Sequence, residues 1–498
     1  MISDKLAKAR EFEAQYQTYA DEERPMFHVT GNIGWINDPN GFSVYKDEYH
    51  LFYQYYPYDV VWGPMHWGHI KTKDFIKWER LPAALAPDTE ADRNGCFSGT
   101  ALEMPDGRQL LMYTGVYNVR RTDGIREQFQ HQCIAIGDGV NYEKYADNPV
   151  IDASFLPDDA SPLDFRDPKV WYDEEEKMYY SVVGNRPADG SGSILLFESE
   201  DALNWRFVHV LDACYNDYGR MWECPDFFPL DGKQILIVSP QEMKPIGLEF
   251  HAGYGVVCLM GSYDKKTKKF EREHVQAVDY GIDFYAPETL ETPDGRRIMI
   301  AWMQNWTTSG CKKENCRIFG SMTLPRELTI KNNRLIQNPV RELANYHGRR
   351  VFYENVLVNR EVNLNGIRGR HIDMTVDVRP IEEGKTYNWF KLNLAKDGEH
   401  SAVIRFKPSC STVRIDRTRC GSSFDIVHVR DFLVRPNGSK IRFRVVMDGN
   451  SVELFVNDGE QAATFLLYLD DLSADCISFE SDGGSVFIDV EKYDIVVK

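Results

Sequence analysis

The sequence predicts an all-β protein: a five-bladed β-propeller followed by an antiparallel β-sandwich, with a short N-terminal helix. Three observations support this. Most of the chain consists of short aromatic and β-branched runs separated by acidic and glycine-containing turns, which is a strand pattern. A degenerate repeat of about 60 residues runs through the first two thirds. At 498 residues the chain also exceeds what one hydrophobic core usually serves, so at least two domains are expected.

The first 25 residues carry the helix prediction. Apolar side chains recur there at helical spacing, and Ser3 and Asp4 precede them as candidate caps. The apolar positions are Ile2, Leu6, Ala9, Phe12, Tyr16 and Tyr19. We therefore expect residues 1–25 to form one amphipathic helix that packs on the main domain.

Five similar segments follow, and each opens with aromatic and polar residues and ends in an apolar strand. They cover residues 35–56, 96–116, 165–184, 221–240 and 284–302. Their markers are 60, 69, 56 and 62 residues apart, taking Asp38, Ser98, Asp167, Glu223 and Tyr285. One propeller blade needs four strands and their turns, which matches this length. The spacing predicts a five-bladed propeller over residues 26–337, whose inner strands bring distant residues to one central channel.

The last third of the chain has a different organisation. Residues 338–349 are expected to form a short helical linker. Residues 350–498 alternate strands with Asp-Gly turns at 448–449 and 458–459, which is typical of an antiparallel sandwich. This second domain carries no recognisable chemistry in its sequence, so we expect a structural or glycan-positioning role.

Composition restricts the partners. A formal charge of −18 repels phosphate backbones and anionic lipid surfaces, so we expect no nucleic acid and no membrane partner. A small sugar or oligosaccharide fits better, and the oligomeric state is not readable. The opening 25 residues hold no apolar run of signal-peptide length, and the ten cysteines are thinly spread. We expect a cytoplasmic protein with reduced, mostly buried thiols.

No metal site and no cofactor are predicted. The cysteines lack the paired spacing of a zinc site. His66 and His69 stand close together, but nothing in the sequence places further ligands beside them, so we interpret them as structural.

Three short motifs share one design: a carboxylate near an aromatic residue and just ahead of a proline. Residues 35–41 read Trp-Ile-Asn-Asp-Pro-Asn-Gly, residues 165–168 Phe-Arg-Asp-Pro, and residues 222–225 Trp-Glu-Cys-Pro. If the propeller brings Asp38, Asp167 and Glu223 together, they supply the paired carboxylates that cleave glycosidic bonds. The motifs therefore favour a sugar-cleaving enzyme.

The surroundings of the three acids support a sugar pocket. Aromatic and amide side chains at 51–57 and 62–64 offer stacking faces and hydrogen-bond partners for hydroxyl groups. Arg166 is expected to keep Asp167 ionised. On a regular strand the neighbours of Glu223 point to the opposite face, so we expect Glu223 alone, and not Trp222 or Cys224, to enter the channel.

In this order and spacing, the three motifs resemble the signatures of glycoside hydrolase family 32, the invertases, sucrose-6-phosphate hydrolases and fructanases. Further segments with the same resemblance occur at 97–99, 283–286, 301–303 and 452–459, so it covers nearly the whole chain. The resemblance implies a propeller-plus-sandwich enzyme that releases terminal β-D-fructofuranosyl units with retention of configuration. Ile36 stands where many members have methionine, a change that leaves the chemistry untouched.

The resemblance also implies roles for individual residues. Asp38 is the expected nucleophile, Asp167 the expected stabiliser of the oxocarbenium-like transition state, and Glu223 the expected acid/base. The terminal fructose is expected to be held by Asn37, Gln54, Trp62, Phe97, Ser98, Arg166, Asp283 and Trp302.

Several alternatives remain open. The chain could prefer sucrose, sucrose 6-phosphate, inulin or levan, or transfer the fructosyl group to another sugar. A related five-bladed enzyme acting on arabinose or xylose units, or a non-catalytic glycan-binding propeller, would share the architecture. A phosphorylated leaving group would require a Lys/Arg cluster at the outer pocket. Candidate stretches are residues 117–132, with Arg120, Arg121 and Arg126, and residues 309–317, with Lys312, Lys313 and Arg317.

Overall fold

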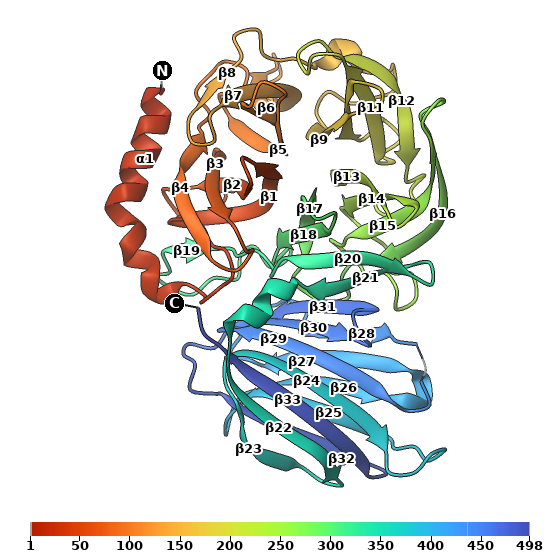
Figure 1. Cartoon of the computed structure of the whole chain (residues 1–498). Coiled ribbons are helices and arrows are strands. Elements are labelled where there is room, and N and C mark those ends of the chain that lie inside the picture. Colours follow the sequence, from red (N-terminus) through yellow and green to blue (C-terminus); the bar gives the residue numbers. More distant parts are fainter. Residues whose placement is uncertain (1, 436, 498) are drawn as a thin grey trace.

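The computed structural model describes residues 2–435 and 437–497 and confirms the predicted fold class. Figure 1 shows a propeller above a two-sheet sandwich, with one helix along the outer side of the propeller. Helix α1 (Asp4–Tyr16) continues into the 3-10 turn η1 (Gln17–Glu23). In the described part of the chain, no helix is long and apolar enough to cross a membrane.

Helix α1 begins with a side-chain cap and packs against the outermost strand of the first blade. The Ser3 hydroxyl accepts a hydrogen bond from the Leu6 N–H, which satisfies one of the free donors at the helix start. Leu6 and Ala9 are buried as predicted, but Ile2 and Tyr19 are exposed. The apolar stripe is shorter than expected because the α-helix begins at Asp4, after Ile2, and ends at Tyr16, before Tyr19.

Five sheets, one of five strands and four of four strands, are arranged around one axis, and strands β1, β5, β9, β13 and β17 lie innermost. The first consists of β1 (Gly34–Tyr45), β2 (Glu48–Tyr56), β3 (His66–Thr72) and β4 (Trp78–Leu85), with β19 (Ile318–Phe319) added in parallel to β1. The second consists of β5 (Gly95–Glu103), β6 (Gln109–Arg120), β7 (Arg126–Gly137) and β8 (Tyr142–Lys144). The third, which follows η2 (Ala153–Phe155), consists of β9 (Phe165–Asp173), β10 (Met178–Asn185), β11 (Ser193–Ser199) and β12 (Arg206–Ala213).

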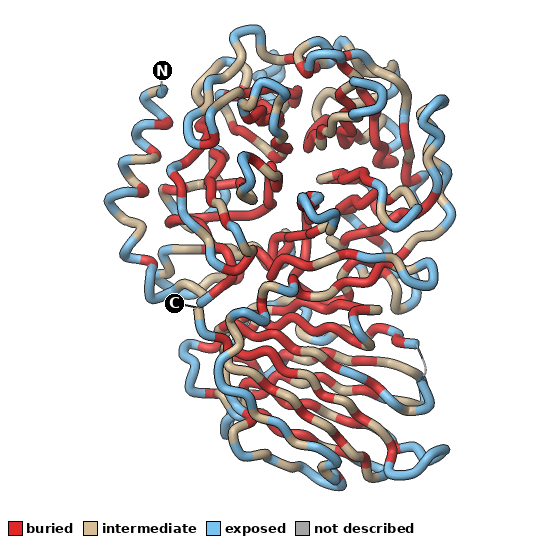
Figure 2. Tube along the Cα trace, in the orientation of Figure 1, coloured by how far each residue is buried: buried red, intermediate tan, exposed pale blue. Residues whose placement is uncertain are grey.

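The remaining two sheets complete the ring. The fourth consists of β13 (Trp222–Leu230), β14 (Lys233–Pro240), β15 (Val257–Asp264) and β16 (Lys269–Ala277). The fifth consists of β17 (Tyr285–Glu291), β18 (Arg297–Trp302), β20 (Arg326–Lys331) and β21 (Arg334–Pro339). Strands β1, β5, β9, β13 and β17 contact one another in turn and close a circle. Figure 2 shows these inner strands mostly buried, whereas exposed segments lie at the periphery.

The inner strands share a backbone irregularity that explains the repeat seen in the sequence. The strand pairing shifts register at each marker: once each in β5, β13 and β17, once in β9 between Arg166 and Lys169, and twice in β1. Four of the five strands carry a proline there, at positions 39, 168, 225 and 287. Proline has no N–H to donate to a strand ladder, so it belongs at such a bulge. The repeat is thus a repeated bulge at the centre of the propeller.

The sandwich is built from two six-stranded antiparallel sheets that follow the turn η3 (Arg341–Tyr346). One holds β22 (His347–Val358), β33 (Val486–Ile495), β24 (His371–Pro380), β29 (Ile441–Asp448), β30 (Ser451–Val456) and β31 (Gln461–Leu466). The other holds β23 (Val362–Arg368), β32 (Cys476–Asp482), β25 (Trp389–Lys396), β26 (Ser401–Lys407), β27 (Thr412–Arg419) and β28 (Val429–Leu433), with η4 (Pro408–Cys410) between β26 and β27. Their facing side chains form one apolar core that continues into the propeller.

Buried ion pairs join the two domains. Arg326 of β20 donates to Glu453 of β30 and to Asp279, and all three side chains are essentially inaccessible. His28 lies between Asp448 and Glu453 at 2.9 Å from each. This network holds the sandwich against the propeller, below it in the view of Figure 1.

Candidate active site

A cavity of about 360 Å³ opens at the centre of the propeller and contains all three predicted acids. Nine of the eleven predicted site residues line it: Asn37, Asp38, Gln54, Trp62, Phe97, Ser98, Arg166, Asp167 and Glu223. A larger hollow of about 660 Å³ lies mainly along the sandwich, but ion-paired side chains fill its wall and none of the three acids reaches it. The central cavity is therefore the candidate active site.

Asp38 lies in the first bulge of β1 and is held by neighbours from two blades. Its Oδ1 accepts a hydrogen bond of 3.0 Å from the Asn37 side chain, and its Oδ2 accepts one of 2.9 Å from the Ser98 hydroxyl. Asn37 is itself oriented by the Trp35 ring N–H at 2.8 Å. The carboxylate thus has a fixed orientation toward the cavity.

Asp167 is placed by a backbone that few residues adopt. Its φ is +66°, in the left-handed region, where a non-glycine residue is uncommon and worth a functional explanation. The Asp167 N–H donates to the Thr114 hydroxyl at 2.9 Å, and its Oδ2 accepts from the Cys224 N–H at 3.0 Å. These contacts hold the strained turn and aim the carboxylate at the cavity.

Glu223 is positioned by an arginine on one side and a phenol on the other. Its Oε1 accepts from Arg166 at 3.0 and 3.2 Å, and its Oε2 accepts from the Tyr285 hydroxyl at 2.7 Å. Arg166 also donates to Asp164 at 2.8 Å, so one guanidinium serves two carboxylates directly. Both carboxylate oxygens of Glu223 are therefore oriented before any substrate binds.

Cys224 corrects the expectation that only Glu223 enters the channel from its motif. The register shift between Glu223 and Asp226, with φ of +47° at Cys224, breaks the alternation of a regular strand. The thiol consequently lies 3.6 Å from Asp38 Oδ2 and 3.7 Å from Asp167 Oδ2. One sulfur thus bridges the two aspartates.

Burial dominates the electrostatics of the site. It raises the pKa of Asp38 to about 6, with a further contribution from the negative charge of Glu223. It also raises the pKa of Asp167 to about 7: Arg166, 3.9 Å away, opposes this shift, while Glu223 and Asp38 add to it. Arg166 therefore acts on the pKa of Asp167 in the direction expected from the sequence, but it does not offset burial and the neighbouring acids.

Two predicted residues do not line the cavity. Asp283 is fully buried and paired with Arg417 of the sandwich, and it also accepts the Leu466 N–H at 2.8 Å. Trp302 is fully buried at the end of β18 and packs edge-on against Trp306 at 5.2 Å. The first residue stabilises the domain interface, and the second supports the cavity wall from behind.

The cavity also contains residues that the predicted set of site residues left out. They are Gln128, Gln130, Leu163, Asp164, Gln241, Tyr254 and Trp306. Gln128 and Gln130 belong to the stretch 117–132 that was expected to shape the outer pocket. Asp164 stands two residues before Arg166, and this closeness to the motif could have identified it as a site residue. Gln241, Tyr254 and Trp306 lie outside the strands, where no periodic pattern identifies them.

The second basic stretch, residues 309–317, contributes no lining residue. Lys312 and Lys313 donate to the carbonyls of Val60 and Leu469, and Arg317 donates to the Tyr19 carbonyl. His66 and His69 are buried, and burial lowers the pKa of each. In the part of the chain that the structure describes, no group of three or more His, Cys, Asp or Glu side chains could hold a metal ion.

Comparison with known proteins gives matches over both domains. The Glycosyl hydrolases family 32 N-terminal domain matches residues 28–339, and the family 32 C-terminal domain matches residues 342–495. The sucrose-6-phosphate hydrolase of Zymomonas mobilis is 36% identical, over 89% of this chain and 85% of that protein. That of Bacillus subtilis is 34% identical, over 89% of this chain and 88% of that protein. A solved family 32 β-fructofuranosidase from Bombyx mori superimposes with a TM-score of 0.82 at 32% identity, covering 98% of each chain.

Proposed function

The chain belongs to glycosyl hydrolase family 32, and on that premise we propose that it releases terminal β-D-fructofuranosyl units from sucrose or fructo-oligosaccharides through a covalent fructosyl-enzyme. The family and the fructosidase class predicted from the three motifs are confirmed. One observation carries the proposal: three blades deliver Asp38, Asp167 and Glu223 to one cavity, where Cys224 bridges the first two and Arg166 joins the last two.

Asp38 and Glu223 would carry the two chemical steps. In the first, an Asp38 oxygen attacks the fructosyl C2 while the bond from C2 to the glycosidic oxygen breaks, and Glu223 gives its proton to that oxygen. In the second, Glu223 takes a proton from water, and the water oxygen attacks C2 and displaces Asp38. Two displacements at C2 retain the configuration.

Asp167 would stabilise the positive charge that develops on the sugar ring as the bond breaks. Its position supports this role, because its Oδ2 lies within 3.7 Å of the sulfur that also contacts Asp38. The raised pKa of Asp167 means that it is most effective when neighbouring charge keeps it ionised. A developing cation in the cavity supplies such a charge.

The cavity wall would position the fructose ring. Trp62 lines the cavity, is 44% exposed and meets Phe97 edge to face at 5.8 Å, so its indole would be accessible to stack on a sugar ring. Gln54 is held by the Cys96 carbonyl at 3.0 Å, and Asn37 by Trp35. Oriented amides of this kind bind sugar hydroxyls with defined geometry. Asp283 and Trp302 are proposed to act only as supports.

We further propose a small sugar as the ligand and the cytoplasm as the location. In support, six of the ten cysteines are buried as free thiols, which suits a reducing compartment.

The first test supplies the purified protein in parallel with sucrose, sucrose 6-phosphate, inulin and levan, and measures free fructose. Fructose from sucrose or a related substrate supports the proposal. A folded protein that releases none from any of the four would overturn it and would favour a pentosidase or a binding domain.

A further inference from the structure

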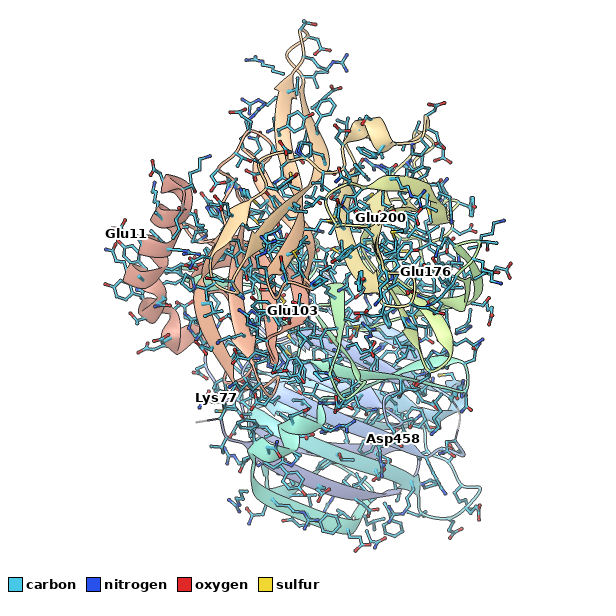
Figure 3. The ribbon with its side chains drawn as sticks, turned by 45° about the horizontal axis from the view of Figure 1, so that its top comes forward. Glu11, Lys77, Glu103, Glu176, Glu200 and Asp458 are labelled. Carbon is cyan, nitrogen blue, oxygen red and sulfur yellow. The ribbon has the colours of Figure 1, made fainter. Side chains whose placement is uncertain are left out.

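The hairpin formed by β6 and β7 extends the wall of the active-site cavity outward. It is the pale orange hairpin that projects at the top of Figure 3. Gln128 and Gln130 of β7 line the cavity, and side chains two residues apart on a strand share a face. Arg126, two residues beyond Gln128, therefore continues the same row toward the cavity mouth, at about 7 Å per step.

A second arginine stands directly beside Arg126. The strand pairing places Arg120 of β6 opposite Arg126, as it places Asn118 opposite Gln128 and Val116 opposite Gln130. Residues directly opposite in an antiparallel pair project from the same face of the sheet. Arg120 and Arg126 thus form a cationic pair, the Arg120–Arg126 pair, at the outer end of the row of cavity residues.

The other face of the hairpin shows a different arrangement of charge. Arg121 forms ion pairs with Glu127 at 2.9 Å and Asp123 at 3.3 Å. Tyr117 and Phe129 stack on that same face, 5.5 Å apart. Arg121 is neutralised locally, so it has no charge to spare for a ligand.

Neither member of the Arg120–Arg126 pair has an ion-pair or side-chain hydrogen-bond partner among residues 2–435 and 437–497. Like charges directly opposite each other destabilise a strand pair. The described residues supply no acid to offset this repulsion. An anion bound between the two arginines would therefore stabilise the strand pair. Paired guanidinium groups suit a phosphate in particular, because they donate in a fork geometry to its oxygens.

The cavity itself offers no other cation for this purpose. Arg166 is the only lysine or arginine among the lining residues, and it already contacts Glu223 and Asp164. The basic residues at 312, 313 and 317 donate to carbonyls elsewhere. A phosphate on the substrate would therefore have to be bound outside the cavity lining, further out along the hairpin than Gln130 and Gln128.

We propose that the Arg120–Arg126 pair binds a phosphate ester on the leaving-group sugar, so that the enzyme prefers sucrose 6-phosphate to sucrose. This inference rests on the proposed function. The fructosyl ring would occupy the acidic end of the cavity, the glucosyl ring would lie along Gln130 and Gln128, and its phosphate would reach the pair. The chemistry of bond cleavage is the same for both substrates.

The test compares kcat/KM for fructose release from the two substrates in three proteins. These are the wild type, the Arg120→Ala/Arg126→Ala double variant, and Arg121→Ala as the matched control from the opposite face of the hairpin. We expect the wild type to prefer sucrose 6-phosphate. In the double variant the ratio of kcat/KM for sucrose 6-phosphate to that for sucrose should fall about ten- to hundredfold, mainly through KM. The control should keep the wild-type ratio, and a double Lys variant should recover part of it.

Two results would overturn the inference alone: a wild type that turns over sucrose without preferring the phosphate ester, or a double variant whose ratio is unchanged or falls no further than that of Arg121→Ala. If neither substrate yields fructose with folded wild-type protein, the proposed function fails, and the inference fails with it. Thermal unfolding of all variants verifies folding, and no loss is expected because the side chains at 120, 121 and 126 are exposed.

Discussion

Two clusters of buried carboxylates lie in this molecule, one in the central cavity and one between the domains. The cavity cluster holds Asp38, Asp167 and Glu223 around a single arginine that also serves Asp164. In the interdomain cluster, Arg326 and His28 supply two cations to Asp279, Asp448 and Glu453. Both clusters consist of buried carboxylates, but they differ in how completely cationic side chains balance the negative charge.

The consequences for protonation are opposite for two of the three interdomain carboxylates; Asp279 is the exception, because burial raises its pKa in spite of Arg326. In the cavity, burial raises the pKa of Asp38 and Asp167. Between the domains burial has the same tendency, but His28, His371 and backbone N–H groups hold the pKa of Asp448 well below its usual range. Arg326 and His28 likewise lower the pKa of Glu453. Balanced carboxylates stabilise a fold, whereas incompletely balanced ones remain available for chemistry.

The largest expected effect is the loss of turnover when a cavity acid is neutralised. Asp38→Asn and Glu223→Gln should each lower kcat by at least about a hundredfold, because they remove the nucleophile and the proton donor. Initial rates of fructose release on the preferred substrate measure this. Near-normal turnover in either folded variant would contradict the assigned roles.

The same Asp38→Asn variant should be more stable than the wild type. The folded pKa of Asp38, about 6, exceeds its unfolded value, so folding must bury a charge at pH 7 to 8. Removing that charge should raise the free energy of unfolding by roughly 1–3 kcal/mol at pH 8, and the gain should shrink as pH falls toward 4. Thermal or urea unfolding at both pH values checks it.

Substitution within the Asp283–Arg417 pair, next to the interdomain cluster, should lower the free energy of unfolding, whereas Asp38→Asn should raise it. Arg417→Met leaves Asp283 buried without its cation, and breaking a buried pair on one side costs about 3–5 kcal/mol. Urea unfolding should show this loss. The double variant Asp283→Asn/Arg417→Met should recover much of it, because no unpaired charge remains. A single variant as stable as the wild type would show that the pair does not stabilise the interface.

The stability of the interface should also depend on alkaline pH through His28. Burial alone would lower the pKa of His28, but Asp448 and Glu453 raise it to about 9. Because the folded pKa exceeds the unfolded value of about 6.5, the stabilisation is fully present below pH 6.5 and is lost as pH rises through 9. The loss should reach about 3 kcal/mol, and unfolding curves of His28→Gln between pH 6 and 10 should lack it. Equal pH dependence in both proteins would refute this assignment.

The sequence predicted the architecture and the acid cluster because both leave local signals. Alternating strands, turn residues and a recurring proline at the bulge repeat along the chain. Each catalytic candidate lies inside such a repeat, so the ring of inner strands brings them together as expected. Nine of the eleven predicted site residues reach the cavity for this reason.

The sequence did not reveal features that depend on partners far along the chain or on irregular backbone. Asp283 opens a motif-like segment, but its partner Arg417 lies in another domain. The inward thiol of Cys224 follows from a left-handed φ at a bulge, which a period of two cannot predict. Gln241, Tyr254 and Trp306 reach the cavity from loops, whose course depends on tertiary packing.

The smallest expected effect is a shift in the pKa of the nucleophile Asp38 when the neighbouring thiol is replaced. The pKa values of Asp38 and Asp167 are raised to about 6 and about 7, so kcat/KM should fall as pH drops through this range and the nucleophile becomes protonated. The Cys224 thiol, 3.6 Å from Asp38, is a weak donor to the ionised form. Cys224→Ser supplies a stronger donor and should move the acidic limb down by about 0.5 to 1 pH unit, whereas Cys224→Ala removes the donor and should move it up. Identical profiles for all three proteins would show that burial alone sets the protonation of the nucleophile, and that the thiol bridging the two aspartates contributes only packing.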